Sequence, residues 1–196
     1  MKNRIKQLFE QSIEIKIAIA DSMQGLLVKA AQRLVTCLLN DGKILICGNG
    51  GSAANALHFS VAMMNRFELE RPSLPVIALT NDIATITAIG NENHYVEIFA
   101  KQIQAIGRDN DILLALSTSG NTDSILQAVN AANDHNIDTI LLSGRDGGLL
   151  ATRLGPEDIE IRIPSDNAGR IREMHLFILH CFCDLIENSL FGQLLK

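Results

Sequence analysis

The sequence lacks the cysteine spacing of a disulfide framework or a zinc finger. Its four cysteines are Cys37, Cys47, Cys181 and Cys183. On a helix, the two thiols of Cys181-x-Cys183 would point to different faces. We therefore expect reduced, structural thiols.

The chain also lacks a long apolar run and a dense block of Lys and Arg. No stretch reaches the eighteen or so apolar residues of a membrane span, and Met1–Arg4 does not lead into the apolar core of a secretion signal. The net charge is -5, which argues against a large electrostatic contact with nucleic acid. These absences predict a cytoplasmic protein with no membrane partner and no direct nucleic-acid partner.

What the sequence does contain is enough apolar material for a real core. Of its 196 residues, 47% are hydrophobic and 20% are charged, a composition typical of one soluble globular domain. No internal repeat, linker or low-complexity segment divides the chain. We expect a single domain over residues 1–196, with helices in residues 1–40 and a sheet with its helices in residues 41–196.

Short apolar runs typical of β-strands recur along the chain, and helix-like segments separate them. The runs are Lys43–Cys47, Pro75–Leu79, Asp111–Leu116, Thr139–Leu142 and Ile159–Ile163. This alternation indicates an α/β fold in which helices cover a parallel sheet.

Helical patterns stand at both ends of the chain. Lys2–Ala20 and Gln24–Leu39 precede the first strand, and a βαβ domain does not need them, so we expect them to pack against another subunit. Asn167–Leu190 reads as one long helix with apolar residues on nearly all sides. Such a helix is usually buried on several sides.

Two loops rich in glycine, serine and threonine follow the first and third predicted strands. They are Gly48–Ser52 and Ser117–Thr122, and each ends where a helix is predicted to start. Free N–H groups at a helix start and flanking hydroxyls suit a phosphoryl group. Either loop alone could be only a turn and a cap, but the pair favours a phosphorylated ligand. Neither loop matches the nucleotide-binding patterns, so ATP and NAD are poor candidates.

Four motifs, in order, resemble the phosphoheptose isomerase family of sugar isomerase (SIS) domains. They are Cys47–Ser52 (CGNGGS), Leu116–Asn121 (LSTSGN), Ser143–Gly148 (SGRDGG) and Arg170–His175 (RIREMH). The resemblance covers nearly the whole chain. It implies a doubly wound, flavodoxin-like sheet of five parallel strands, assembled as a homotetramer.

Within that family the chain looks much like the branch that associates with the replication initiator DnaA. The segments that carry this likeness are Ser52–Ala56, Asn65–Glu68, Glu70–Pro75 and Cys181–Ile186. The likeness implies a homotetrameric scaffold that binds DnaA and promotes the initiation of replication. It also implies that Leu190 and Phe191 contact the partner, although packing of Phe191 onto its own core is an equal alternative.

The family's chemistry converts sedoheptulose 7-phosphate to glycero-manno-heptose 7-phosphate. By resemblance, a histidine, a glutamate one turn later, a glutamine and a second histidine hold zinc, with the glutamate as base and the second histidine as acid. His58 and His180 match the two histidines, so His180 would be the acid of an active enzyme. The glutamate position holds Ala62 and the glutamine position holds Arg172.

Both departures weaken the expected zinc site. Alanine can neither ligate a metal nor take a proton, and a permanent guanidinium charge competes with a divalent cation. We therefore expect no zinc, and Arg172 could instead hold an anionic or hydroxyl-rich ligand. Gly169 also replaces an aspartate that the family often has. With two ligands lost, we favour core packing for both His58 and His180.

The residues expected to bind the phosphate depart less from the family pattern than the zinc ligands do. By resemblance, the residues that would contact the sugar phosphate are Asn49, Gly50, Gly51, Ser52, Ser117, Thr118, Ser119 and Thr122, with Asn91 and Glu92 near the sugar. Thr122 stands where the family often has serine, and Glu92 where it often has aspartate. No catalytic role is expected for His94, His135 or His175, and Glu173 is expected to hold the start of the last helix.

Two functions remain open on this basis. The preferred one is a DnaA-binding tetramer that has lost its isomerase chemistry and retains a phosphosugar pocket. The alternative is a working, zinc-dependent phosphoheptose isomerase that supplies heptose for lipopolysaccharide. The residues at positions 62 and 172 discriminate between them.

Overall fold

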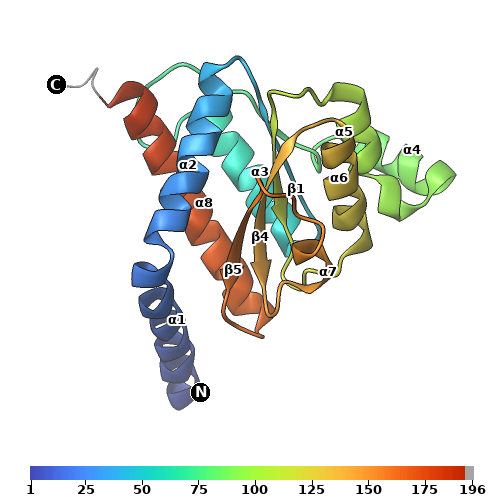
Figure 1. Ribbon diagram of the computed structural model, residues 1–196. Helices are drawn as coiled ribbons and strands as arrows, with labels where there is room; N and C mark the ends of the chain where they lie inside the picture. Colours follow the sequence, from blue (N-terminus) through green and yellow to red (C-terminus); the bar gives the residue numbers. More distant parts are fainter. Residues whose placement is uncertain (193–196) are drawn as a thin grey trace.

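Five parallel strands form one sheet in the order β2-β1-β3-β4-β5. The computed structural model describes residues 1–192 (Figure 1). The strands are β1 (Ile44–Gly48), β2 (Val76–Ala78), β3 (Ile112–Leu116), β4 (Asp138–Gly144) and β5 (Ile159–Ile163). The doubly wound, flavodoxin-like α/β class expected from the sequence is confirmed, because this strand order has its switch point between β1 and β3.

Eight α-helices and one 3-10 helix, η1, connect or flank the strands within residues 1–192. They are α1 (Lys2–Ser22), α2 (Gln24–Leu39), α3 (Gly51–Met64), α4 (Ile83–Asn93), η1 (Tyr95–Glu97), α5 (Ala100–Ile106), α6 (Asp123–Asp134), α7 (Gly148–Ala151) and α8 (Ala168–Phe191). The two leading helices and the long last helix lie where the sequence predicts them.

The sheet separates two apolar clusters because successive strand residues point to opposite faces. On one face, Ile44 and Ile46 of β1 join the apolar residues of α2, α3 and α8. On the other, Leu45 and Cys47 join those of α5 and α6. Every residue of β1 and β3 is buried, as expected for central strands covered by helices on both faces.

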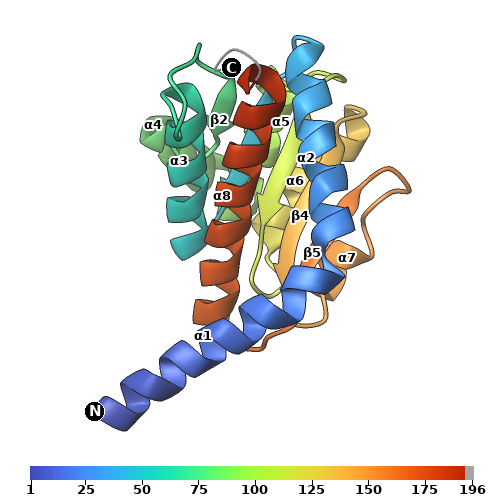
Figure 2. The same cartoon turned by 90° about the vertical axis from the view of Figure 1, so that its left-hand side faces the viewer.

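The first helix extends away from this body (Figure 2). Of its 21 residues, only Ser12 and Ile19 are buried. Four large apolar side chains at four-residue intervals are exposed by between 51% and 67%: Ile5, Phe9, Ile13 and Ile17. Residues four apart share one side of a helix, so α1 presents an apolar stripe to its surroundings.

The last helix, α8, belongs to the larger of the two apolar clusters, which it forms with α2, α3 and one face of the sheet. It is the one described helix with the length and apolar content of a membrane span. In this fold it packs beside α2 and α3 (Figure 2), and nine of its residues are buried. A core helix of a globular protein has the same composition.

The four thiols are unpaired, as the sequence predicts. Burial is the main reason why the pKa of Cys37 and the pKa of Cys183 are both raised to about 12. Thiols in this state are neutral and unreactive, which fits a structural role.

Candidate phosphosugar site

The two glycine-rich loops leave the sheet at its switch point. The last residue of β1, Gly48, is paired in register with Leu116, the last residue of β3. The loops that follow lead into α3, with Gly50 as its N-cap, and into α6, with Thr122 as its N-cap. Ligands of open α/β sheets bind at this edge, and the two helix starts give it N–H groups suited to an anion.

Glycine is required at two positions of this edge. Gly50 and Gly120 have φ angles of +55° and +68°, which side-chain-bearing residues rarely adopt. A Cβ on Gly120 would lie 1.9 Å from the carbonyl oxygen of Gly147. The second loop therefore packs backbone against backbone on the loop after β4.

The first loop is fixed to its surroundings through Asn49. Its Nδ2 donates to Oγ of Ser124 at 2.8 Å, and its Oδ1 accepts from the hydroxyl of Tyr95 at 2.7 Å. Ser52, in the first turn of α3, is buried. Tyr95 belongs to no motif, and the only mark it carries in the sequence is that it is the sole tyrosine.

The second loop is shaped by its own hydroxyls. Oγ of Ser117 accepts from the N–H of Gly120 at 3.1 Å and lies 3.2 Å from Oγ1 of Thr122. Ser117 is buried, whereas Thr118 and Ser119 are half-buried. Thr118, Ser119 and Thr122, which is also half-buried, are thus the more accessible hydroxyl-bearing residues of this loop.

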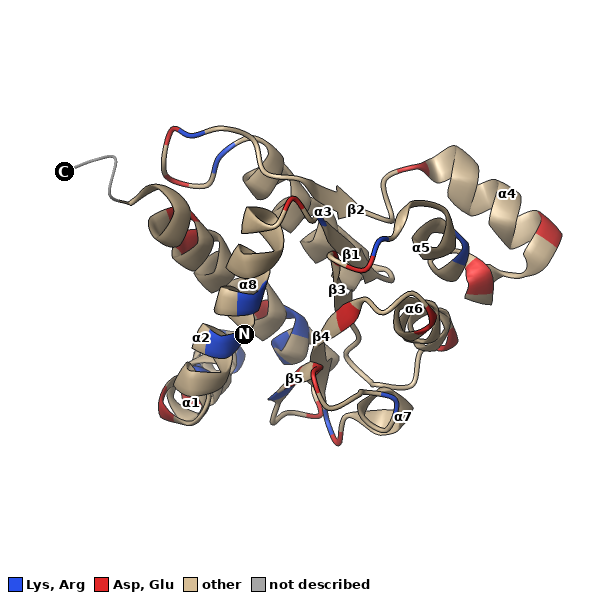
Figure 3. Ribbon diagram, turned by 45° about the horizontal axis from the view of Figure 1, so that its top comes forward, with Lys and Arg blue, Asp and Glu red and all other residues tan. Residues whose placement is uncertain are grey.

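The residues predicted near the sugar lie apart from the loops. Asn91 and Glu92 are exposed residues of α4, which lies across the sheet from α8 (Figures 1 and 3). Within residues 1–192 their side chains form no hydrogen bond with either loop. Their predicted contact with a sugar stays a prediction.

A pair of histidines joins α3 to α8. Nε2 of His58 lies 2.8 Å from Nε2 of His180, and the ring centroids are 4.9 Å apart. Burial, followed by the nearby His58, lowers the pKa of His180. His58 is exposed and His180 is half-buried, so the favoured placement of both in the core does not describe this pair. Each imidazole instead satisfies the other.

Ala62 and Arg172 do not complete a zinc site. Ala62 is buried one turn after His58, and α3 carries no charged residue (Figure 3). No group of three His, Cys, Asp or Glu side chains suited to a metal occurs in the described chain. Two imidazoles that bind each other, with an alanine one turn after His58 where a third ligand would stand, are a poor donor set for zinc.

The side chain of Arg172 lies over the first loop. A Cβ on Gly51 would lie 2.7 Å from Cδ of Arg172 and 3.0 Å from its Nε. Nδ2 of Asn55 donates to the backbone oxygen of Arg172 at 3.0 Å, which ties the two helices together there. Figure 2 shows α3 and α8 side by side. The guanidinium group therefore belongs with the phosphate loops.

Two more polar residues of α8 have structural partners. His175 is fully buried, and its Nε2 lies 2.9 Å from the carbonyl oxygen of Ser143 at the end of β4. Burial lowers its pKa to about 4, so it is neutral at pH 7. Glu173 contacts Ser12 and Lys16 of α1 and Arg170 of its own helix. The structural role expected for Glu173 fits these contacts.

The predicted partner residues lie near the end of α8. Leu190 and Phe191 are half-buried and pack against the larger core cluster. This is the packing that the sequence left open as the alternative to partner contact.

Comparison with known proteins gives consistent results. A family model described as SIS domain matches residues 7–144. The phosphoheptose isomerase of Shewanella loihica is 51% identical over 193 residues, covering 98% of each chain. The structure of a phosphoheptose isomerase from Francisella tularensis superposes with a TM-score of 0.92 at 47% identity, covering 95% of this chain and 97% of that one. The structure of phosphoheptose isomerase from Neisseria gonorrhoeae superposes with a TM-score of 0.91 at 40% identity, covering 95% of this chain and 98% of that one.

These findings correct the preferred function. Relatives that share half of the residues over nearly the whole chain are named phosphoheptose isomerases, and none of these comparisons supports DnaA binding or the initiator-associating branch. The prediction of a DnaA-binding scaffold is therefore wrong, and the alternative isomerase function is the better supported one. The chain belongs to the phosphoheptose isomerase family of SIS-domain proteins.

Proposed function

We propose that this protein binds a phosphorylated heptose and interconverts its ketose and aldose forms, with sedoheptulose 7-phosphate as the substrate. The names of its relatives support the reaction class. The observation that carries the proposal is the alignment of the two phosphate loops with the histidine pair along α3 and α8.

Distance along the helices relates the two parts of this site. Arg172 faces Gly51, and eight residues later His180 faces His58. At a rise of about 1.5 Å per residue, the two levels are about 12 Å apart along α8. An extended seven-carbon sugar phosphate has a comparable length. With its phosphate at the loops, its carbonyl end reaches the histidines.

The phosphate half would hold the ligand by backbone and hydroxyl groups. The residues assigned to it are Asn49, Gly50, Gly51, Ser52, Ser117, Thr118, Ser119, Thr122 and Arg172, with Asn91 and Glu92 assigned to the sugar. The guanidinium of Arg172 adds a fixed positive charge for an anionic group.

The histidine half would move the proton. Isomerisation moves one proton from the hydroxyl-bearing carbon to the neighbouring carbonyl carbon, while a second proton passes between the two adjacent oxygens of the cis-enediol. A lowered pKa keeps His180 neutral near pH 7. When its Nε2–H donates to His58, Nδ1 of His180 is free to accept the carbon-bound proton and to return it. His58 orients His180 through their shared hydrogen bond. This route involves no metal.

A second candidate is binding of the sugar phosphate without turnover. The specific observation in its favour is Ala62, because by resemblance the family has its base at that position. A protein with the phosphate half intact and a weakened histidine half would bind the ligand as a sensor does.

One experiment separates the two candidates. Purified protein is incubated with sedoheptulose 7-phosphate, with and without zinc, and the aldose product is followed while calorimetry measures binding. Turnover of about 1 per second or more supports the isomerase. Binding without product supports the second candidate, and the absence of both contradicts the proposal.

We further propose that the protein assembles with copies of itself, as a homotetramer, in the cytoplasm. The exposed stripe on α1 supports the assembly, since large contiguous apolar patches usually mark contact surfaces. Light scattering tests it: Ile13→Glu should lower the measured mass, whereas a wild-type monomer would contradict it.

A further inference from the structure

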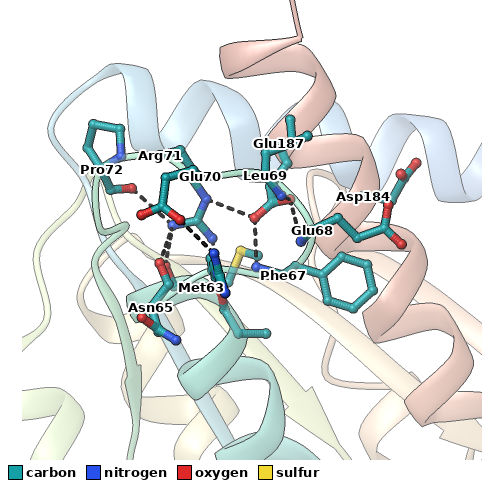
Figure 4. Close-up of polar contacts among 12 residues, drawn as sticks. Met63, Asn65, Phe67, Glu68, Leu69, Glu70, Arg71, Pro72, Asp184 and Glu187 are labelled. Carbon is teal, nitrogen blue, oxygen red and sulfur yellow. Dashed lines mark hydrogen bonds and ion pairs between the residues drawn. The ribbon is translucent and has the colours of Figure 1, made fainter. Parts of the chain in front are cut away.

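A buried ion pair lies beside the histidine pair. Arg71, in the segment after α3, and Glu187, on α8, have side chains that are 0% and 1% exposed. Nε of Arg71 lies 2.9 Å from Oε1 of Glu187 (Figure 4). Burying two charges is costly unless their other polar atoms are also satisfied. The remaining partners of the pair therefore indicate what it holds in place.

Glu187 holds three consecutive backbone groups. Its carboxylate accepts the N–H groups of Phe67 at 2.8 Å, Glu68 at 2.9 Å and Leu69 at 2.9 Å (Figure 4). Burial raises its pKa, but these N–H groups and Arg71 outweigh burial and hold the pKa of Glu187 below its ordinary value. The carboxylate thus fixes the course of the segment 67–69.

Arg71 holds the end of α3. Its Nη1 donates to the carbonyl oxygen of Met63 at 2.7 Å, and its Nη2 to that of Ala62 at 2.9 Å. The last carbonyl groups of a helix have no partner within that helix. The guanidinium group takes their place and fixes the last turn of α3, one turn after His58.

The segment held by this pair contacts His180. The ring of Phe67 lies 5.5 Å from the imidazole of His180, centroid to centroid. Glu68 and His180 line the same open groove of about 530 Å³. Glu187 follows His180 by two helical turns, so both residues lie on one side of α8. Helix α8 therefore carries both His180 and Glu187, whose carboxylate fixes the segment 67–69 beside that imidazole.

We propose that the Arg71–Glu187 ion pair is a positioning device for the histidine half of the site. It sets the end of α3 and the segment 67–69, and through Phe67 it sets the orientation of the His180 ring. Arg71 and Glu187 touch no substrate and act through other residues. This inference rests on the proposed function, since it assigns a role at the same site.

The test compares two buried carboxylates. Glu187→Gln keeps the side chain's shape and removes its charge. Asp111→Asn is the matched control: Asp111 is 1% exposed, pairs with Lys43 at 2.5 Å and accepts the N–H groups of Lys43 and Arg108 at the opposite edge of the sheet. Each variant is studied below its melting temperature. The readouts are the ring resonances of His180 at fixed pH, without ligand, and the turnover of sedoheptulose 7-phosphate.

We expect Glu187→Gln to shift the His180 resonances and to lower turnover by about ten-fold to 100-fold. Asp111→Asn should lower the melting temperature and leave both readouts unchanged. If both variants lower the melting temperature and neither moves His180, the pair is only structural and the inference is overturned. If Glu187→Gln does not fold, Arg71→Lys is judged by the same criterion, because lysine keeps the charge but lacks the guanidinium fork.

The resonance separates this inference from the proposed function. A wild-type protein that does not bind the sugar phosphate contradicts the proposed function. The His180 shift of the ligand-free variants still decides whether the ion pair positions the ring.

Discussion

The two halves of the site are built from different parts of the chain. The phosphate half consists mainly of backbone: glycines with positive φ, helix starts and hydroxyls that bond within their own loop. The histidine half consists of side chains on the neighbouring helices α3 and α8. A site made of backbone survives most side-chain replacements, whereas one made of side chains changes with a single residue. Ala62, at the position where the family has its base by resemblance, is such a change in the histidine half.

The largest expected effect is in the histidine half, from His180→Gln. Glutamine can keep a hydrogen bond to His58 but cannot carry the proton. We expect turnover to fall by about 10² to 10⁴-fold, with sugar-phosphate affinity changed less than three-fold. Steady-state kinetics and calorimetry on the same preparation measure both. An equal loss of affinity and turnover would mean that His180 binds the ligand and does not move the proton.

The next largest effect is expected from a substitution in the phosphate half. In Gly120→Ala, the new Cβ would lie 1.9 Å from a backbone oxygen at a φ of +68°, so the loop must move. Positive φ and overpacking together suggest a loss of about 3 kcal/mol in the free energy of unfolding. Urea denaturation measures it, and binding should be lost even at temperatures where the variant is folded.

Gly25→Ala is the control for that variant. Gly25 lies in α2, and a Cβ there meets nothing within 4 Å. We expect it to stabilise the fold by about 0.5 to 1 kcal/mol. Unimpaired stability and binding in Gly120→Ala would show that the second loop does not need its glycine.

The sequence predicts the backbone half well and the side-chain half poorly. Strand alternation and the two glycine-rich loops depend on local patterns, and all five strands lie within two residues of their predicted ends. The contact of Tyr95 with Asn49 depends on how η1 packs, and no motif records it. The pairing of His58 with His180 joins residues 122 positions apart. The sequence favours core packing for both histidines because two expected ligands are missing, and the structure corrects this.

Low pH should weaken the contact between α8 and β4, near the place where the two halves of the site meet. His175 ties α8 to the end of β4, and burial lowers its pKa from 6.5 to about 4. The unfolded chain binds its proton below pH 6.5 and the folded protein only near pH 4. Stability is therefore lost as pH falls from 6.5 to 4, by about 3 kcal/mol. Urea denaturation at several pH values in this range should show a free energy of unfolding that falls as pH falls. In His175→Gln this dependence on pH should be absent. Equal slopes would mean that other groups cause the loss.

The smallest expected effect tests which half of the site Arg172 belongs to. Arg172 lies over the phosphate loop, although by resemblance its position belongs to a metal site. Arg172→Gln should weaken sugar-phosphate binding by about ten-fold, or about 1.4 kcal/mol, through loss of a charged hydrogen bond. Stability should be unchanged, because the side chain of Arg172 is exposed. Arg108→Gln removes the same charge at the opposite edge of the sheet and should leave affinity unchanged. If Arg172→Gln keeps full affinity but gains stoichiometric zinc, the position belongs to the histidine half, and the boundary drawn between the halves is wrong.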